Sequence, residues 1–369
     1  MNPYDFVPLD VQHPPERSTP IWHNVLKPDR GKLYSGHLYM YIRAETPIFI
    51  PNDGLSMQDP DKAGEHIYDG HGNYIIPGSS IKGMLRTVVE TLCRGCLTVI
   101  NSRDVPTDFL PCENNTSLCI ACRLFGMMPR QRNAQVFLGK VNIGDALAFD
   151  RNPTYHPSIY TAILEAPKPR HTAFYRNAAG LIAGRKFYFH HKQLLTEKEL
   201  LPTRDNDGYR NQYIRPLAIG TDFSARIDFI NLLADEFAAL LFAILPRSDI
   251  RHKIGYGKPL GLGSVQLNVT NLQLVDYTNR YKQFHTEGGI SSYKGQALYD
   301  LLDEQMVSID PQINDTWNTF KSLTSLNELH RIWRWPPNHT IEYAYPSKRW
   351  FANNRWARIK DTERLRQGD

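Results

Sequence analysis

The residues of this chain best suited to hold a metal ion are its cysteines, which form two Cys-x-x-Cys pairs around one further cysteine. They are Cys93, Cys96, Cys112, Cys119 and Cys122. Cysteines spaced in this way supply pairs of thiolates to a tetrahedral Zn²⁺ ion in a reducing compartment. Four ligands complete such a structural site, so one cysteine would be redundant, and His66 or His71 could replace one thiolate. The alternative is a set of small buried side chains that bind no metal.

A second group of residues with chemical potential lies in the loop at residues 51–72. Its acidic and imidazole side chains are Asp53, Asp59, Asp61, Glu65, His66, Asp69 and His71. Carboxylates of this kind bind Mg²⁺, and a loop of such length inside a compact domain is more often functional than structural. The same composition also fits Asx turns and a solvated surface.

The segment Ile76-Pro77-Gly78-Ser79-Ser80-Ile81-Lys82-Gly83-Met84-Leu85-Arg86 predicts the start of a helix over residues 80–93. The Pro-Gly pair breaks the preceding strand, and Ser79 or Ser80 can cap the helix. Lys82 and Arg86 lie four residues apart near the helix N-terminus, where backbone N–H groups and the helix dipole favour a phosphate oxygen. The alternative is an ordinary amphipathic helix whose basic residues are solvated.

A glycine-rich segment at residues 252–264 is the second place where the backbone could approach a polyanion closely. Its candidate contacts are Lys253, Gly255, Tyr256, Gly257, Lys258, Gly261 and Gly263. The spacing matches neither the dinucleotide motif nor the Walker motif, and a strand follows where those motifs require a helix. This argues against an enzyme with a nucleotide cofactor.

Residues 168–191 interleave basic and aromatic side chains, including Arg176, Arg185 and Lys186. Aromatic rings stack on bases while Arg and Lys contact phosphates, so this mixture suits single-stranded nucleic acid. The alternative is a β-hairpin with a basic, solvated face. Residues 348–366 are also basic and aromatic, and could contact nucleic acid or another subunit.

Apolar periodicity predicts an α+β fold with the element order β-α-β-β-α-β, a modified ferredoxin-like or RRM-like core with long insertions. The expected strands are 37–49, 136–149, 159–166, 222–230 and 265–275, one more than the four of the core pattern, and the expected helices are 80–93 and 233–245. We expect an N-terminal arm (1–36), the core (37–280) and a helical, basic extension (281–369). Within the core, residues 93–126 form the zinc-binding segment and residues 150–215 an insertion.

The composition limits the class of protein. The chain has 369 residues, of which 41% are hydrophobic and 22% charged, and it lacks the run of roughly 18 apolar residues that spans a membrane. The first ten residues lack the layout of a secretory signal. We therefore expect a cytoplasmic protein with no membrane partner. A net charge of +5 permits nucleic acid as a partner without requiring it.

Three segments in combination resemble the RAMP superfamily of CRISPR-associated proteins: Ile76 to Arg86, Cys119 to Gly126, and Gly255 to Gly263. More narrowly, they are similar to the backbone-forming subunits of type III effector complexes. Shorter matches to a longer CRISPR-associated RAMP subgroup are Phe6-Val7-Pro8, Tyr34-Ser35-Gly36, Gly184-Arg185-Lys186-Phe187-Tyr188 and Phe229-Ile230-Asn231-Leu232. The resemblance spans about residues 5–275.

The resemblance implies a modified RRM-like fold that assembles along a CRISPR RNA (crRNA) beside other effector subunits, namely RAMP neighbours and a large signalling subunit. It implies a thumb hairpin that kinks the pairing of crRNA with target RNA, and zinc near the cysteines. It also implies guide contacts at Ser79, Ser80, Lys82 and Arg86, and in the glycine-rich loop. In cleaving relatives one aspartate supports Mg²⁺-dependent target cleavage; Asp59 and Asp61 lie nearest its place, although the surrounding pattern differs.

The leading hypothesis is therefore an RNA-binding backbone subunit of a type III CRISPR ribonucleoprotein, to which a target-cleavage site could be added. One alternative is a free-standing endoribonuclease that processes precursor crRNA, with His66, His71, His190 or His191 as general base. Another is a zinc-stabilised scaffold that never contacts RNA.

Overall fold

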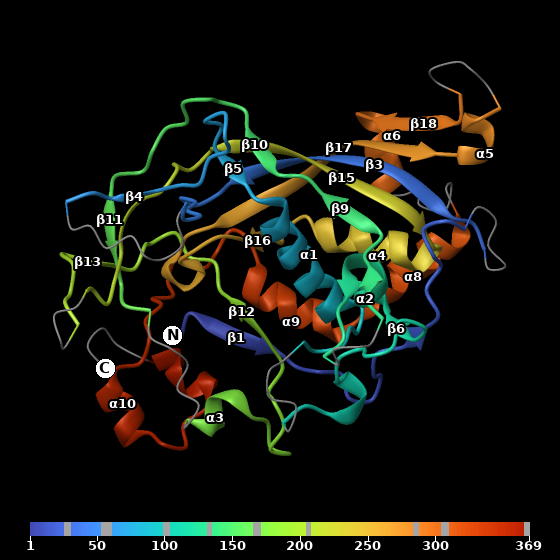
Figure 1. Ribbon diagram of the computed structural model, residues 1–369. Coiled ribbons are helices and arrows are strands. Elements are labelled where there is room, and N and C mark those ends of the chain that lie inside the picture. Colours follow the sequence, from blue (N-terminus) through green and yellow to red (C-terminus); the bar gives the residue numbers. More distant parts are fainter. Residues whose placement is uncertain are drawn as a thin grey trace.

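A large antiparallel sheet with helices packed against one face forms the centre of the computed structural model (Figure 1). The structure describes residues 1–25, 31–52, 61–98, 104–130, 135–164, 171–203, 208–282, 288–303 and 310–364. The strands run across the sheet in the order β16 (His252–Lys253), β17 (Ser264–Val275), β3 (Tyr34–Ala44), β15 (Asp222–Leu232), β10 (Ala146–Ala148) and β5 (Ile75–Ile76). Beside this path, β9 (Val141–Ile143) pairs with β15, and β18 (Ile290–Lys294) pairs with β17.

Two interleaved β-α-β units account for this strand order. In the first unit, β3 leads to α1 (Gly78–Leu92) and then to β9 and β10. In the second, β15 leads to α4 (Ala234–Ile244) and then to β17. In the sheet, β15 lies between β3 and β10, and β3 lies between β17 and β15. All of these neighbouring strands pair antiparallel. This arrangement confirms the predicted ferredoxin-like core.

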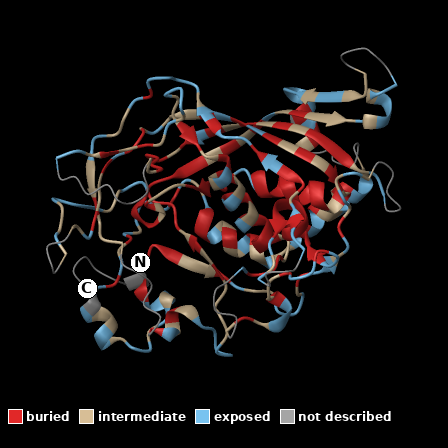
Figure 2. Cartoon of the chain, in the orientation of Figure 1, coloured by how far each residue is buried: buried red, intermediate tan, exposed pale blue. Residues whose placement is uncertain are grey.

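The core lies between the sheet and the helices, where Figure 2 shows the buried residues concentrated. Alternation along β3 turns Leu38, Met40 and Ile42 toward this side, and each is at most 1% exposed. From α1, apolar side chains meet them at helical spacing, as predicted. Burial of each large aliphatic side chain contributes about 1.5–3 kcal/mol, so this layer supplies much of the driving force for folding.

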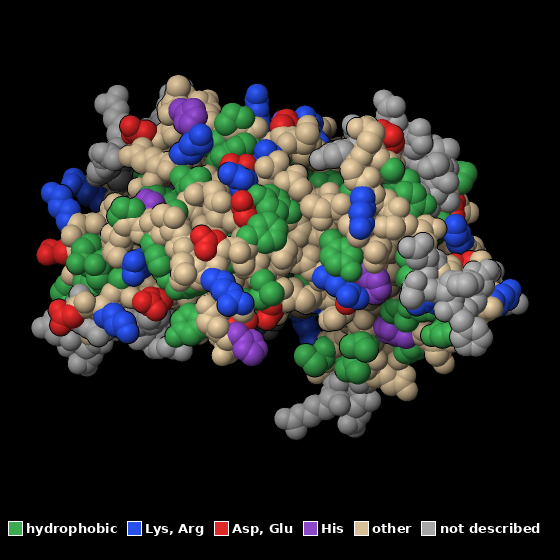
Figure 3. All heavy atoms as spheres, turned by 90° about the horizontal axis from the view of Figure 1, so that it is seen from above, with side chains coloured by type: hydrophobic (Ala, Val, Ile, Leu, Met, Phe, Trp, Pro, Cys, Tyr) green, Lys and Arg blue, Asp and Glu red, His purple; other side chains and the backbone are tan. Residues whose placement is uncertain are grey.

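The opposite face of the sheet carries mixed charge. Arg43 of β3 lies 3.4 Å from Asp222, and Arg226 lies 2.6 Å from Asp228, both acids being on β15. Seen from this side, Lys and Arg side chains alternate with Asp and Glu side chains and do not gather into one basic patch (Figure 3). The described side chains of the open sheet face therefore offer an RNA backbone no concentrated positive charge.

The start of α1 differs from the prediction. The helix begins at Gly78, and neither Ser79 nor Ser80 caps it, because both lie inside the first turn. The cap comes from Asp145, whose Oδ1 accepts the Gly78 N–H at 2.7 Å. A carboxylate here also interacts favourably with the positive end of the helix dipole. Asp145 is distant in sequence, so local pattern could not identify it.

Three of the C-terminal helices pack into the same core. They are α6 (Gln296–Asp303), α8 (Pro311–Ser322) and α9 (Thr324–Trp333). The short helix α10 (Lys348–Asn353) lies apart from this core, and its Phe351 ring packs against His171 and Phe174. α8 lies against α4, where the rings of Phe242 and Trp317 meet edge to face with centroids 4.9 Å apart. Phe320 and Leu329 are buried in the same cluster. The predicted helical extension is present, and it forms part of the central hydrophobic layer.

The N-terminal segment is docked by strand pairing and by contact with the C-terminal part of the chain. β1 (Tyr4–Val7) pairs antiparallel with β12 (Arg185–Tyr188). The Met1 amino group donates to the Glu342 backbone oxygen at 2.7 Å. Of the expected hairpin at residues 168–191, residues 168–170 lie outside the described part. The remainder contains α3 (Thr172–Tyr175), a short antiparallel bridge between Arg176 and Ile182, and β12, which pairs with β1.

Short elements complete the fold. The expected strand at 159–166 is β11 (Ile159–Thr161), which lies outside the central sheet. It joins β13 (Thr196–Glu197), β14 (Tyr213–Arg215) and β4 (Gly64–Glu65) in a smaller sheet. Near the cysteines are β2 (Arg17–Ser18), β6 (Leu118–Cys119), α2 (Ile120–Phe125), β7 (Gly126–Met127) and β8 (Phe137–Leu138). Among the helices described, none has the length and apolar character needed to cross a membrane.

Candidate functional site

Four of the five cysteines come together in a buried group formed by Cys96, Cys112, Cys119 and Cys122. Their Sγ atoms all lie within 4.8 Å of one another. The Sγ atoms of Cys96 and Cys122 are 3.6 Å apart, close to the edge of about 3.8 Å that a tetrahedron with Zn–S bonds of about 2.3 Å requires. The donor set therefore fits a structural metal such as zinc. Cys93 lies outside the group, at the C-cap of α1.

Backbone amides orient the thiolates of this group. The Cys119 N–H donates to Cys112 Sγ at 3.4 Å, and the Cys96 N–H donates to Cys119 Sγ at 3.5 Å. Contacts of this kind around a metal ligand fix its geometry and stabilise its negative charge. Cys119 holds its place because it is the N-cap of α2, the helix that carries Cys122.

The two histidines considered as substitute ligands do not belong to the metal group. His66 is fully buried, where Nδ1 accepts the Ile50 N–H at 3.2 Å and Nε2 donates to the Ile75 oxygen at 2.8 Å. Burial lowers the pKa of His66 to about 4, so the ring is neutral at neutral pH. His71 is exposed. The structure therefore corrects the expectation that either could replace a thiolate.

Two arginines predicted to contact RNA instead surround the cysteine group, and Glu90 joins them. Arg86 donates from Nε to Glu90 at 2.8 Å and from Nη1 to the Gly126 oxygen at 2.9 Å, and its Nη2 lies 3.5 Å from Cys122 Sγ. Arg185, which is 8% exposed, donates from Nη1 to Glu90 at 3.0 Å. Its Nη2 donates to the backbone oxygens of Gly95 and Cys96. Both guanidinium groups therefore hold the four-cysteine group in place.

At the start of α1, the remaining predicted contacts differ in exposure. Ser79 is exposed, whereas Ser80 and Lys82 are half-buried. Burial, assisted by the nearby Arg86 charge, lowers the pKa of Lys82. Lys82 is the cation on this turn with no ion pair among the described residues, so it is the one most available to a phosphate.

The glycine-rich segment forms a tight loop between β16 and β17, around the single-turn helix η2 (Lys258–Leu260). All four glycines adopt positive φ: Gly255 +84°, Gly257 +66°, Gly261 +98° and Gly263 +71°. A Cβ on Gly263 would lie 1.9 Å from the Ile254 oxygen, so no other residue fits there.

Lys253 holds this loop from inside. It is 3% exposed, and its Nζ donates to the backbone oxygens of Lys258 and Leu262, each at 3.1 Å. Burial, with a smaller effect of the Lys258 charge, lowers the pKa of Lys253 to about 7. Lys253 therefore positions the loop and is not placed to contact a ligand from the surface.

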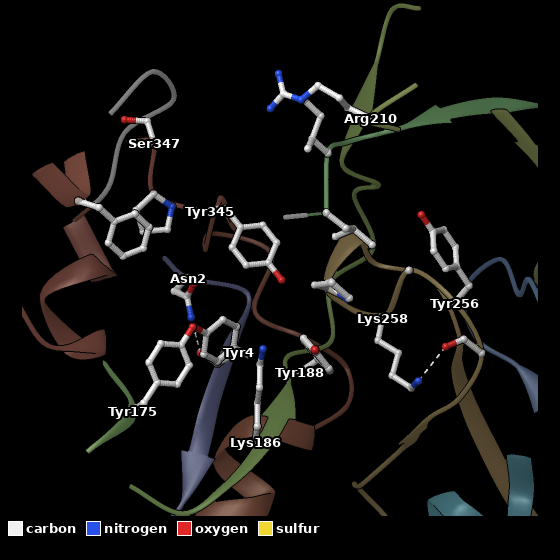
Figure 4. A pocket seen from close by; sticks show the side chains of 17 residues that line it. Asn2, Tyr4, Tyr175, Lys186, Tyr188, Arg210, Tyr256, Lys258, Tyr345 and Ser347 are labelled. Atoms are coloured by element: carbon white, nitrogen blue, oxygen red, sulfur yellow. Dashed lines mark hydrogen bonds between the residues drawn. The ribbon is translucent and has the colours of Figure 1, made fainter. Parts of the chain in front are cut away.

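A cavity of about 490 Å³ brings the glycine-rich loop together with the basic-aromatic strand β12 (Figure 4). Four predicted RNA contacts of the loop line it, Gly255, Tyr256, Gly257 and Lys258, as does Lys186 of β12. The Lys186 Nζ lies 3.7 Å from the ring centroid of Tyr4 and 5.0 Å from that of Tyr188. Burial lowers the pKa of Lys186 to about 8. None of the described lining residues is an Asp or a Glu.

Other predicted residues lie elsewhere. Arg176 is exposed and forms an ion pair with Asp104 at 2.8 Å. Asp61 is exposed, and Asp59 lies outside the described residues. The described lining of the cavity does not include Ser79, Ser80, Lys82 or Arg86.

Sequence reasoning missed the lining residues that come from the two ends of the chain and from residues 163–210. These are Asn2, Tyr4, Ile163, Leu164, Arg210, Tyr345, Pro346 and Ser347. Tyr175 and Phe351 also line the cavity, and they belong to the basic-aromatic segments 168–191 and 348–366 that the sequence indicated. The signal that could have found Tyr4 is the alternation of Tyr4 and Phe6, which matches that of β12. The pairing of these two strands was not predictable from either one alone.

A family model described as the RAMP superfamily matches residues 41–266, which is more than half of the chain. The chain belongs to the RAMP superfamily. The match begins within β3 and ends within β17, so it includes both β-α-β units, the cysteine group and the glycine-rich loop of this RAMP protein. A search of curated proteins found no match. Membership in the superfamily indicates a CRISPR-associated role in RNA binding.

Proposed function

We propose that this RAMP protein is an RNA-binding backbone subunit of a type III CRISPR ribonucleoprotein, holding crRNA and pairing it with target RNA. The observation that carries the proposal is the cavity in which Lys186 and Lys258 lie among tyrosine rings with no described carboxylate in its lining. Cations contact phosphates without regard to sequence, and aromatic side chains stack on unpaired bases.

The cysteine group has a supporting role in this proposal. Through Arg185 it is connected to β12, the strand whose Lys186 lines the cavity. A metal such as Zn²⁺ would be held by the four thiolates, where it would cross-link α2, the turn that follows α1 and the segment between them. In this arrangement the side chains of the cavity bind the RNA, and the metal stabilises the position of the segments that support β12.

Equilibrium binding of a short single-stranded RNA to the purified chain tests the proposal. We expect affinity to fall as salt rises, because each neutralised phosphate contributes about −0.7 to the slope of log K against log salt. Lys258→Met should reduce both affinity and slope. Absence of salt-sensitive RNA binding, in the chain alone and in its complex, would contradict the proposal and favour the scaffold without RNA contact.

The finer parts of the proposal have their own tests. Co-purification from cells should recover crRNA with neighbouring RAMP subunits and the large signalling subunit. Target-RNA cleavage would depend on Asp59 or Asp61 with Mg²⁺, and the assembled complex carrying Asp59→Ala or Asp61→Ala tests each separately. A free-standing endoribonuclease is less well supported, because His66, His190 and His191 are buried and hydrogen-bonded to protein groups.

A further inference from the structure

The ammonium group of Lys186 lies in a partly closed aromatic site. The rings of Tyr4 and Tyr188 lie 3.7 and 5.0 Å from its Nζ by their centroids, a distance range typical of cation–π contact. Within the described part of the chain, no carboxylate forms an ion pair with Lys186. A cation removed from water without an acidic partner is costly, and a bound anion would offset that cost.

The surroundings of Lys186 add flat apolar surface and further positive charge. Tyr175, Tyr256 and Tyr345 contribute rings to the same lining, and Figure 4 shows Tyr345 facing the cavity between the N-terminal strand and the glycine-rich loop. Lys258 stands on the loop side, with its Nζ 2.8 Å from the Gly255 oxygen. A ligand for this lining combines a planar ring with a negative group.

Asn2 supplies an independent sign of a missing partner. It is 1% exposed and lines the cavity, and its Nδ2 donates to the Tyr4 oxygen at 2.8 Å. Its Oδ1 is buried and has no hydrogen-bond partner among the residues that the structure describes. Buried polar atoms are rarely left unpaired, so an acceptor here points to a donor brought by a ligand.

We propose that this cavity binds one nucleoside phosphate unit, with its base against the tyrosine rings and its phosphate at Lys186 on the side facing Lys258. The volume of about 490 Å³ lies in the range of small-molecule sites. The unit could be an unstacked nucleotide of a bound RNA strand or a free nucleotide, since the recognised chemistry is the same. The RNA source rests on the proposed function, whereas the free nucleotide does not.

Binding measurements on the full chain test the proposal with two probes, adenosine monophosphate and a short single-stranded oligoadenylate RNA. The variants are Lys186→Met, which removes the charge but keeps the aliphatic stem, and Tyr345→Ala, at a position that is 38% exposed. Each should weaken binding of at least one probe about tenfold, in line with the loss of one stacked ring or one phosphate contact. Ribose 5-phosphate, which lacks a base, should bind more weakly than adenosine monophosphate.

Two matched controls lie outside the cavity. Lys192 places its Nζ 5.6 Å from the Trp335 ring, so Lys192→Met removes a similar cation–π contact, and Tyr281→Ala removes a ring that is 83% exposed. Neither should change binding. Thermal unfolding of all four variants separates lost folding from lost binding, and Tyr345→Ala serves if Lys186→Met fails to fold.

The outcomes distinguish this proposal from the proposed function. Adenosine monophosphate bound at the cavity without any RNA binding would support the pocket and contradict the RNA-binding role. RNA bound equally by wild type and both pocket variants, together with no binding of adenosine monophosphate, would support the RNA-binding role and overturn the pocket. Weakened RNA binding in the variants, without affinity for the free nucleotide, assigns the site to a nucleotide of the strand. A chain that binds neither probe overturns both.

Discussion

Arg185 and Lys186 are adjacent in β12, yet their charged ends lie on opposite sides of the strand. Arg185 contacts Glu90 at 3.0 Å beside the cysteine group, whereas Lys186 lies 3.7 Å from the Tyr4 ring in the cavity. Successive strand side chains point to opposite faces, so one short strand serves both sites. The four-cysteine group and the cavity are therefore connected through β12.

Lys82 and Arg86 are predicted to respond differently to loss of charge, although both were candidate guide contacts. Arg86→Met should lower the free energy of unfolding by about 2–3 kcal/mol, because Glu90 loses a charged hydrogen-bond partner. It should also speed metal loss to a chelator. Lys82→Met should change stability by less than about 0.5 kcal/mol and weaken RNA binding. Urea unfolding and RNA titration measure both; equal stability losses would contradict the assignment.

The contrast shows what the sequence could and could not predict. The spacing of apolar residues gave the β-α-β-β-α-β order, because that order depends on local periodicity. The Cys-x-x-Cys pairs indicated a four-thiolate site, because the spacing within each pair is also a local feature of the sequence. The choice of Cys96 over Cys93 depends on how α1 ends, which no spacing rule specifies. Whether a basic residue is buried or exposed depends on partners that are distant in the sequence. Arg185, for example, is buried because it pairs with Glu90.

The metal centre predicts unequal effects of cysteine substitution. If the four thiolates hold Zn²⁺ as the donor set suggests, Cys112→Ser removes one of them, so the purified variant should contain less zinc than wild type and be less stable by more than about 4 kcal/mol. Cys93→Ser is the matched control, because Cys93 lies outside the group, and it should retain the metal. Elemental analysis together with thermal unfolding measures both. Full zinc content in Cys112→Ser would contradict the four-cysteine site.

A buried ion pair between Lys140 and Glu236 predicts a large loss of stability when one partner is removed. Their charged atoms lie 2.6 Å apart, and both side chains are 0% exposed. Lys140→Met leaves the Glu236 carboxylate buried without this partner, so we expect a loss of about 3–5 kcal/mol. The control is Arg43→Met, at an exposed pair with Asp222, which should cost less than about 1 kcal/mol. Equal losses of unfolding free energy in Lys140→Met and Arg43→Met, measured by urea unfolding, would contradict this prediction.

Two buried histidines predict that the chain loses stability in mild acid. Burial lowers the pKa values of His66 and His252 to about 4, whereas an unfolded histidine titrates near about 6.5. Between these values the unfolded chain binds more protons than the folded chain. Their contribution is therefore fully present above about pH 6.5 and is lost as the pH falls toward about 4.

Replacing one of these histidines should flatten that dependence. In His252→Gln the amide can still donate to the Ala243 oxygen, which His252 Nε2 contacts at 2.8 Å, but it cannot be protonated. The free energy of unfolding of this variant should then fall less steeply with decreasing pH than that of wild type between about pH 6 and 5. We expect the two slopes to differ by about 1.4 kcal/mol per pH unit. Urea unfolding at several pH values measures the slopes, and an unchanged slope in His252→Gln would mean that His252 is already protonated in the folded chain.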